Sequence, residues 1–206
     1  GQGQTSIQKK TSPLDLVTEI DQGIEMLFRI WIQTFFPYDK IIGEEGHKPT
    51  VNETDTLWII DPIDGTTNYT QSKNEVACLI GCLKKGKPYL SVVGLPFEHT
   101  LYSTHINQKH VIKETPTQTT PMHQPSLPKT LPLGTEFLRH RQKEYDLFET
   151  FQNELHLEKN QRYSIAVNMI DILEGRCQAF YKPNVKLWDI TAPLICLDTL
   201  FQDTLS

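Results

Sequence analysis

The sequence predicts a mixed, layered α/β fold, and three observations support this prediction. Short apolar runs typical of strands fill the stretch from residue 57 to residue 104. An amphipathic helical pattern precedes them, and largely apolar helical patterns follow after residue 160. Because 38% of the 206 residues are hydrophobic, the chain can bury a sizeable core, and we expect one domain over residues 1–206.

In the first half of the chain we expect one helix followed by five strands. Apolar side chains recur at helical spacing over residues 21–36, and Pro37 ends that helix. These side chains are Ile24, Leu27, Phe28, Trp31 and Phe35. The strands are expected at residues 40–42, 57–60, 76–83, 89–95 and 100–104. The last three are interpreted as an antiparallel meander, with a turn at residues 84–87.

The second half begins with a polar stretch over residues 105–132, rich in Pro and Thr, which we expect to form a long loop. After it we expect two strands and three helices. The strands are placed at residues 131–136 and 177–181, and the helices at residues 139–155, 165–173 and from 188 onward. Gly175 ends the second of these helices, and Trp188 and Asp189 open the third.

The composition argues against several classes of protein. A net charge of -5 disfavours a sequence-independent nucleic-acid binder, which needs a basic surface. No apolar run approaches the roughly 18 residues of a membrane-spanning helix, and GQGQTSIQKK has no apolar segment of a signal peptide. The four cysteines lie in apolar contexts without paired zinc-ligand spacing, so we expect free thiols in a reducing compartment and a cytoplasmic location.

The segment WIIDPIDGTTNY, residues 58–69, places Asp61 and Asp64 at the end of a buried run. Asp21, Glu44 and Asp189 also lie at expected helix or strand ends. Each acid has an ordinary explanation by itself, since Asp-Gly forms turns and Asp caps helices. Together they indicate a site for a hard cation such as Mg²⁺, which binds oxygen ligands and keeps waters that a phosphate can displace.

Other metal and catalytic motifs do not fit. An EF-hand needs acids at its first, third and fifth positions and Glu at its twelfth, but the twelfth position from Asp61 is Ser72. The sequence contains no GxxxxGK[ST] phosphate loop, no GxSxG elbow and no HExxH zinc motif. These absences disfavour P-loop nucleotide hydrolysis, serine hydrolysis and zinc proteolysis.

The acidic segments resemble the signature motifs of the inositol monophosphatase family. DPIDGTTNY (residues 61–69) resembles the central motif, KTSPLDLVTEID (10–21) the first, IGEE (42–45) the second and LWDI (187–190) the last. They occur in family order over nearly the whole chain. The wider superfamily includes bisphosphate nucleotidases and fructose bisphosphatases, and TTNY after Asp-Gly is more similar to the inositol monophosphatase branch.

The resemblance implies a layered α-β-α-β-α sandwich, shortened here at both ends, and a lithium-sensitive phosphatase with two or three Mg²⁺ ions. It implies that Glu44, Asp61 and the backbone carbonyl of Ile63 hold one metal. Asp61, Asp64 and Asp189 would hold the second. The expected substrate is a small phosphorylated metabolite such as an inositol phosphate, hydrolysed by metal-activated water. Relatives are commonly dimers, so a homodimer is an option.

The resemblance also assigns catalytic and substrate-binding roles. Thr66 and Asp21 would form a hydrogen-bonded pair that helps to activate the water, with Glu44 also near it. The expected substrate contacts are Asp64, Gly65, Thr66, Ser164, Lys182 and Asp189. Within that set, the amides of Gly65 and Thr66 would receive phosphate oxygens, as backbone N–H groups at a helix start can.

Two positions depart from the family pattern. Lys182 stands where the family has an acid that binds polyol hydroxyls, and lysine cannot accept a hydrogen bond. Lys182 can instead meet a second anion, or it is an ordinary exposed lysine. Pro193 lies where the last helix usually carries small residues. Two alternatives therefore stand beside the monophosphatase: a phosphatase for a bisphosphate nucleotide or sugar bisphosphate, and a catalytically weak relative that binds metal or phosphate.

Overall fold

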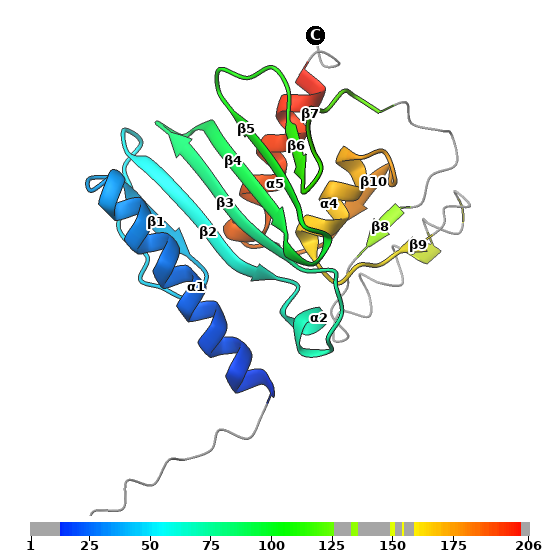
Figure 1. Cartoon of the computed structure of the whole chain (residues 1–206), viewed down its shortest axis with the longest axis horizontal. Helices are drawn as coiled ribbons and strands as arrows, with labels where there is room; N and C mark the ends of the chain where they lie inside the picture. The colour runs from blue at the N-terminus through cyan, green and yellow to red at the C-terminus, as the bar shows by residue number, and fades with distance from the viewer. Residues whose placement is uncertain (1–12, 126–132, 136–148, 151–153, 155–158, 203–206) are drawn as a thin grey trace, which may run out of the picture.

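The computed structural model describes residues 13–125, 133–135, 149–150, 154 and 159–202 (Figure 1). Helix α1 (Pro13–Phe35) lies on one face of a large sheet, and helices α4 (Ile165–Leu173) and α5 (Leu187–Phe201) lie on the other. A small second sheet follows beyond α4. The described layers thus run α, β, α, β, which confirms the predicted mixed, layered α/β class.

The large sheet has seven strands in the order of the chain. They are β1 (Lys40–Gly43), β2 (Thr56–Asp64), β3 (Ala77–Lys84), β4 (Lys87–Leu95), β5 (Thr100–His105), β6 (Ile112–Thr115) and β7 (Gln118–Pro121). Strands β1 and β2 are parallel, and every later neighbour is antiparallel. The expected meander over β3, β4 and β5 is confirmed.

Three short strands form the second sheet, in which β10 (Ala179–Tyr181) and β9 (Lys159–Asn160) both pair in parallel with β8 (Leu133–Thr135). Two short helical turns are also present, namely α2 (Thr66–Thr70) after β2 and η1 (Pro96–Glu98) between β4 and β5. The structure contains no helix, within its described residues, that is long and apolar enough to cross a membrane.

The main core lies between the large sheet and the pair α4 and α5. It consists of Ala77, Leu79, Val93, Leu95, Tyr102, Val111, Ala166, Val167, Ile170, Leu173, Ala192 and Cys196. A second, smaller cluster joins α1 to β1, β2 and β3 through Ile32, Ile41, Trp58, Ile60 and Cys82. All four cysteines are free thiols, as the sequence predicted.

The structure corrects several expected boundaries. Helix α1 begins at Pro13 rather than near residue 21, because proline is well tolerated at the first helical position. Strand β2 continues past residue 60 to Asp64 instead of turning at once. The expected loop over residues 105–132 contains the hairpin β6–β7, which extends the edge of the sheet. The helix expected at residues 139–155 lies largely outside the described residues.

Gly81 lets α5 approach the sheet closely. A Cβ atom built on Gly81 would lie 2.7 Å from Thr191 Cγ2 and 3.3 Å from the backbone nitrogen of Ala192. A Cβ on Gly94, in the neighbouring strand, would make only an ordinary contact of 3.7 Å with Leu101 Cδ1. The absence of a side chain at residue 81 therefore determines how near α5 lies to β3.

We predict that Gly81→Ala lowers the free energy of unfolding by about 1–3 kcal/mol, the usual cost of overpacking a close contact. Gly94→Ala is the matched control in the same sheet, and it should be neutral or slightly stabilising because glycine is unfavourable inside a strand. Urea unfolding of both variants measures the difference. Equal stability of the two variants would contradict the role assigned to Gly81.

Candidate active site

A β-bulge at the end of β2 turns Asp61 and Asp64 toward the same side of the sheet. Asp61 pairs with Leu79 and Asp64 pairs with Ala77, so three steps along β2 match two steps along β3. In a regular strand, residues three apart point to opposite faces. The extra residue of the bulge cancels that difference and places both carboxylates on one face.

The turn inside the bulge is built from short local contacts. Asp61 Oδ1 accepts a hydrogen bond from the Ile63 backbone N–H at 3.1 Å, and the Ile63 carbonyl accepts one from Thr66 Oγ1 at 3.1 Å. The side chain of Ile63 is buried, which leaves its backbone to face the turn. Gly65 has φ 93°, and a Cβ there would lie 2.7 Å from the Glu75 carbonyl oxygen, so only glycine fits without strain.

Asp64 is bound to the N-terminus of α4. Its Oδ2 accepts hydrogen bonds from Ser164 Oγ at 2.5 Å and from the Ala166 backbone N–H at 2.7 Å, and its Oδ1 accepts one from the Ile165 N–H at 3.2 Å. Ser164 also caps the helix by accepting from the Val167 N–H at 3.1 Å. The two predicted site residues Asp64 and Ser164, a hundred positions apart, are therefore in direct contact.

Glu44 lies on the loop after β1, and a side chain of α1 holds this loop in place. Glu25, which is 2% exposed, bonds Arg29 Nε at 2.7 Å and accepts the backbone N–H of Glu45 at 2.9 Å. A Cβ on Gly43 would fall within 2.4 Å of the Glu25 carboxylate, so that glycine gives the buried acid its space. The position of Glu44 thus depends on an ion pair that the sequence analysis did not single out.

Asp189 lies in the first turn of α5, but it is not the N-cap. The helix begins at Leu187 with Lys186 as the preceding cap residue, and Asp189 Oδ2 accepts the Lys186 backbone N–H at 2.9 Å. The helix was expected to open at Trp188 and Asp189, and it begins one residue earlier. An acid at this position still lies near the positive end of the helix dipole.

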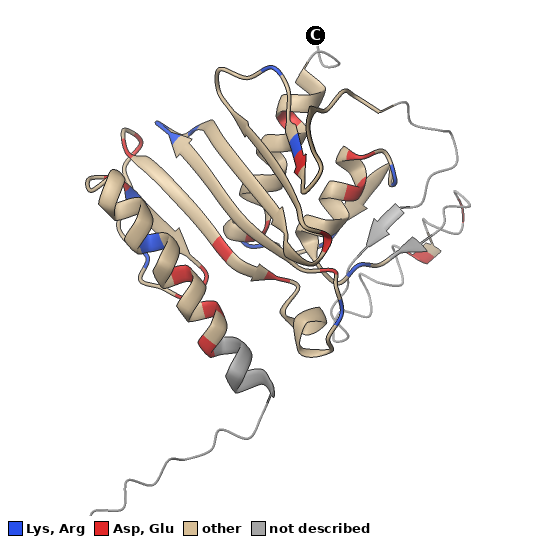
Figure 2. Cartoon of the chain, in the orientation of Figure 1, with Lys and Arg blue, Asp and Glu red and all other residues tan. Residues whose placement is uncertain are grey.

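The five acids of the site raise one another's pKa values by electrostatic repulsion. Burial first, and then the charges of Asp64, Glu44, Asp189 and Asp21, raise the pKa of Asp61 well above its usual value. Partial burial and repulsion by neighbouring acids, Asp189 foremost, raise the pKa of Glu44 to about 7, although its side chain keeps contact with solvent. The acids therefore occupy one region, where the end of β2 meets α1 and α5. Figure 2 shows the acidic segments of α1 and β2.

Asp21 and Asp189 complete this pattern. Burial, together with the charges of Glu45 and Glu25, raises the pKa of Asp21 to about 7. Burial also raises the pKa of Asp189, although the Lys186 N–H and the charge of Lys182 act in the opposite direction. Lys182, from the end of β10, is thus close enough to Asp189 to influence it electrostatically.

The oxygen-rich donor set fits a hard cation. Asp21 Oδ1 is buried and has no hydrogen-bond partner, so it has a free acceptor position. Within the described ranges, no three His, Cys, Asp or Glu side chains lie close enough to enclose a metal ion. Asp61 and Asp189 instead accept hydrogen bonds from backbone N–H groups, and Asp64 accepts from backbone N–H groups and from the Ser164 hydroxyl. The Thr66 hydroxyl donates to the Ile63 carbonyl rather than pairing with Asp21.

Known proteins resemble this chain over most of its length. The profile of the inositol monophosphatase family matches residues 2–198. The chain belongs to the inositol monophosphatase family. The inositol-1-monophosphatase of Synechocystis is 31% identical over 92% of this chain, and inositol monophosphatase 1 of Bos taurus is 30% identical over 91%. The structure of Mycobacterium tuberculosis SuhB superposes with a TM-score of 0.78 at 25% identity, covering 91% of this chain and 74% of SuhB.

These relatives are longer than the chain, which spans 66% of the Synechocystis protein and 69% of the bovine one. Their names are those of phosphoric monoester hydrolases, and enzymes of the family are metal-dependent phosphatases. The family assignment thus agrees with the motifs in the sequence and with the fold.

Two contacts at the site were missed by the sequence analysis. The first is the Glu25–Arg29 pair, which its spacing of four on one helix could have indicated. The second is Lys48, whose ammonium lies 4.2 Å from the ring centroid of Trp188, the residue before Asp189. No local pattern links Lys48 to Trp188, because 140 residues separate them and only the fold brings them together.

We predict that, without metal, the protein loses stability between about pH 4.5 and pH 7. The folded-state pKa values of Asp21 and Glu44, about 7, exceed their ordinary values of 3.8 and 4.5. The folded state therefore binds more protons than the unfolded state in this window, so stability falls as the pH rises through it. Thermal unfolding in EDTA at a series of pH values measures the slope.

Asp21→Asn should flatten this slope and raise metal-free stability at pH 8 by about 1 kcal/mol or more, since one pKa unit corresponds to about 1.4 kcal/mol. The control is Asp198→Asn, an exposed acid on α5. If both variants leave the slope unchanged, repulsion at Asp21 is not the cause.

Proposed function

We propose that the protein is a metal-dependent phosphomonoesterase that hydrolyses a small phosphorylated metabolite of the inositol phosphate type, with Mg²⁺ as its metal. The observation that carries the proposal is the set of coupled acids, in which burial and mutual repulsion hold the pKa values above their normal range. Such a cluster needs either protons or a cation. At neutral pH a divalent ion is the more effective partner.

In this proposal Glu44, Asp61 and the Ile63 carbonyl would hold one Mg²⁺, and Asp61, Asp64 and Asp189 would hold a second. Bound there, Mg²⁺ supplies an activated water and neutralises charge on the phosphate. Support comes from the bulge, which turns both Asp61 and Asp64 to one face, and from the buried Ile63 side chain, which leaves its carbonyl to the turn.

The chain's own groups would position the reactants. Asp21 would help to take up a proton from the attacking water, with Glu44 near it. Their raised pKa values describe the metal-free site, and a bound cation would lower them. Thr66 would orient that water, and the Gly65 and Thr66 amides would bind phosphate oxygens. Asp64 and Asp189 would accept hydrogen bonds from substrate hydroxyls, with Ser164 holding Asp64 in place. Lithium sensitivity and a cytoplasmic location complete the proposal, the latter supported by four free thiols.

We expect Asp61→Asn to abolish phosphate release from every substrate, because it weakens the ligand shared by two metals. Mg²⁺ should raise the thermal midpoint of the wild type, since a ligand that binds only the native state stabilises it. The variant should lose most of this rise. Phosphate release and thermal unfolding with and without about 5 mM Mg²⁺ measure both effects, at a concentration well above the Kd expected for a working site.

Glu53→Gln is the control and should match the wild type, because Glu53 is an exposed acid between β1 and β2 that belongs to none of the motifs. A Mg²⁺-induced rise without phosphate release would favour the catalytically weak relative. No rise at all, combined with no phosphate release, would contradict a metal site.

A second candidate function is hydrolysis of a substrate with a second anion, such as a bisphosphate nucleotide or a sugar bisphosphate. Lys182 acts on Asp189 electrostatically, and Lys48 lies against Trp188, so two cations flank the last acid of the site. Structures of similar fold have been determined with 2'AMP and with NADP and Ca²⁺. A cationic border beside the acids suits such a doubly anionic ligand.

We predict that Lys182→Glu shifts substrate preference from a bisphosphate toward a polyol monophosphate. A carboxylate accepts hydroxyl hydrogens and repels anions, whereas an ammonium does the reverse. The ratio of the two kcat/KM values should change only several-fold, because a partly exposed charge contact contributes about 1 kcal/mol or less. Lys109→Glu, on an exposed loop, is the control. An unchanged ratio would remove the support for this second function.

A further inference from the structure

The side chain of Asn68, on the helical turn α2, is fully buried and joins two distant segments of the chain. Its Nδ2 group donates one hydrogen bond to the Glu75 carbonyl and another to the Arg162 carbonyl, each at 2.7 Å. Glu75 precedes β3, whereas Arg162 lies 94 residues from Asn68, shortly before α4. Because an amide nitrogen carries two hydrogens, both of its donor positions are used. One side chain thus holds α2, the start of β3 and the start of α4 together.

These segments meet at Gly65, the residue after Asp64. A Cβ atom built on Gly65 would lie 2.7 Å from the Glu75 carbonyl oxygen and 3.1 Å from Ser164 Cβ. The same atom would lie 3.6 Å from Asn68 Nδ2. Asp64 itself accepts the hydrogen bond from the Ser164 hydroxyl at 2.5 Å. We call this meeting point the Asn68 junction, and its members are Gly65, Asn68, Glu75, Arg162 and Ser164.

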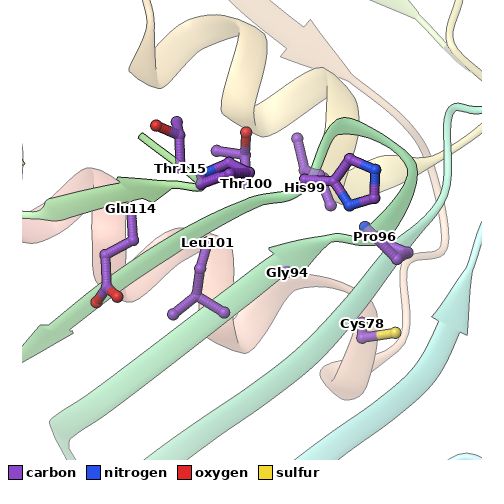
Figure 3. A pocket seen from close by; sticks show the side chains of 10 residues that line it. Cys78, Gly94, Pro96, His99, Thr100, Leu101, Glu114 and Thr115 are labelled. Atoms are coloured by element: carbon purple, nitrogen blue, oxygen red, sulfur yellow. The ribbon is translucent and has the colours of Figure 1, made fainter. Parts of the chain in front are cut away.

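The other neighbour of Asp64 is strand β3, where it pairs with Ala77. The next residue, Cys78, lines a hollow of about 470 Å³ on the sheet (Figure 3). The lining of this hollow, within the described part of the chain, contains none of the five acids of the site. The hydrogen bonds that orient the Asp64 carboxylate come instead from Ser164 and the first amides of α4. The orientation of Asp64 therefore depends on where α4 starts.

Tyr163 connects Arg162 to Ser164 in a left-handed conformation, with φ 53°. This conformation is unfavourable for a residue with a side chain and persists only where surrounding contacts enforce it. Burial of the ring does not enforce it, since Tyr163 is 44% exposed. Before Tyr163, the Arg162 carbonyl accepts from Asn68, and after it, Ser164 is extended and bonds Asp64. The left-handed turn thus connects these two contacts.

Arg162 is held a second time through its guanidinium. Its Nε lies 2.9 Å from Asp171 Oδ2, and Asp171 is a fully buried residue of α4. That ion pair attaches Arg162 to the helix that follows it. Asn68 instead attaches the Arg162 carbonyl to α2, which begins directly after the turn at Asp64 and Gly65. Of these two contacts, Asn68 is therefore the one that fixes the start of α4 relative to this turn.

We propose that Asn68 is a positioning residue for the metal site, because it holds the turn before α4 so that Ser164 and the first amides of α4 orient the Asp64 carboxylate toward a cation. This inference rests on the proposed phosphatase function, in which Asp64 is a metal ligand. Asn68 is not itself a ligand in this proposal. Loss of an outer contact that orients a ligand commonly weakens metal binding about 10–100-fold. Since Asn68 acts on Asp64 through Ser164, we expect the lower end, about 10-fold.

The test is Mg²⁺ binding by the full chain, measured by calorimetric titration at room temperature, where circular dichroism shows whether each protein is folded. Asn68→Ala should bind Mg²⁺ about 10-fold more weakly than the wild type, with the same number of ions bound per chain. A partly unfolded sample would instead bind fewer ions per chain. The affinity and the number of ions bound therefore separate a positioning role from a general loss of structure.

Tyr102→Phe is the control for loss of a buried hydrogen bond elsewhere. Tyr102 is 1% exposed and donates to Glu174 Oε1 at 2.5 Å, but it lies on β5, outside the Asn68 junction. This variant should lose thermal stability and keep the Mg²⁺ affinity of the wild type. Equal weakening of Mg²⁺ binding in Tyr102→Phe and Asn68→Ala would attribute the effect to destabilisation and contradict the positioning role.

Ser164→Ala tests the route from Asn68 to Asp64. If Asn68 acts through Ser164, then Asn68→Ala should weaken Mg²⁺ binding less in the Ser164→Ala background than in the wild type, because coupled residues are not additive. Independent effects would multiply. The same factor in both backgrounds would therefore overturn the proposed route.

A matched pair of variants at Tyr163 tests the turn even if Asn68→Ala does not fold. Tyr163→Gly and Tyr163→Val both remove the ring, but glycine adopts the left-handed conformation readily, whereas β-branched valine rarely does. Tyr163→Gly should bind Mg²⁺ as the wild type does, and Tyr163→Val several-fold more weakly. Equal Mg²⁺ affinity of the two variants would show that this turn does not govern the metal site, and would overturn the proposal.

The outcomes for the positioning role and for the proposed function are distinct. Wild-type Mg²⁺ affinity in Asn68→Ala would overturn the positioning role and leave the phosphatase function intact. Failure of the wild type itself to bind Mg²⁺ and to release phosphate would contradict the proposed function, and the role of Asn68 would fall with it.

Discussion

Repulsion among buried carboxylates dominates the electrostatics of the candidate site. Asp61 is 1% exposed and Asp21 is 5% exposed, and each lies within electrostatic reach of further acids. Isolated carboxylates in such surroundings are costly, so each needs compensating donors or a cation. The chain meets part of this need with its own groups: a bulge N–H for Asp61, the start of α4 for Asp64 and the start of α5 for Asp189. The unpartnered oxygen of Asp21 shows that this compensation is incomplete.

Much of the fold could be predicted from local patterns. The meander of β3 to β5 followed from apolar alternation and a lysine-glycine turn, and α4 followed from a continuous apolar helical pattern closed by Gly175. The hairpin β6–β7 was missed because its residues are mostly polar, with β6 only half-buried and β7 exposed at the edge of the sheet. The start of α1 was missed because the segment from Pro13 to Asp21 mixes acids with apolar residues, and only its continuation has a clear amphipathic pattern.

For the candidate site, too, one part could be predicted from local sequence and another part could not. The acids could be chosen from the sequence, because they follow apolar runs and resemble family motifs, whereas their geometry could not. Spacing alone places Asp61 and Asp64 on opposite faces of a strand, and only the pairing with β3 reveals the bulge that reverses this. Likewise, Ser164 was expected at the pocket, but its bond to Asp64 depends on how α4 docks against the end of β2. Contacts of this kind arise from packing, which no short window of sequence encodes.

The missing side chain of Gly81 has a consequence for evolution as well as for packing. Residue 81 lies beneath Thr191, two positions beyond Asp189 on the same rigid helix. Gly81 and Thr191 therefore set the distance between Asp189 and the sheet, although neither of them carries a charged group. Homologous chains that enlarge residue 81 should shrink residue 191 in compensation, so the two positions should covary. Selection that preserves the position of Asp189 would then also preserve Gly81 in the middle of β3.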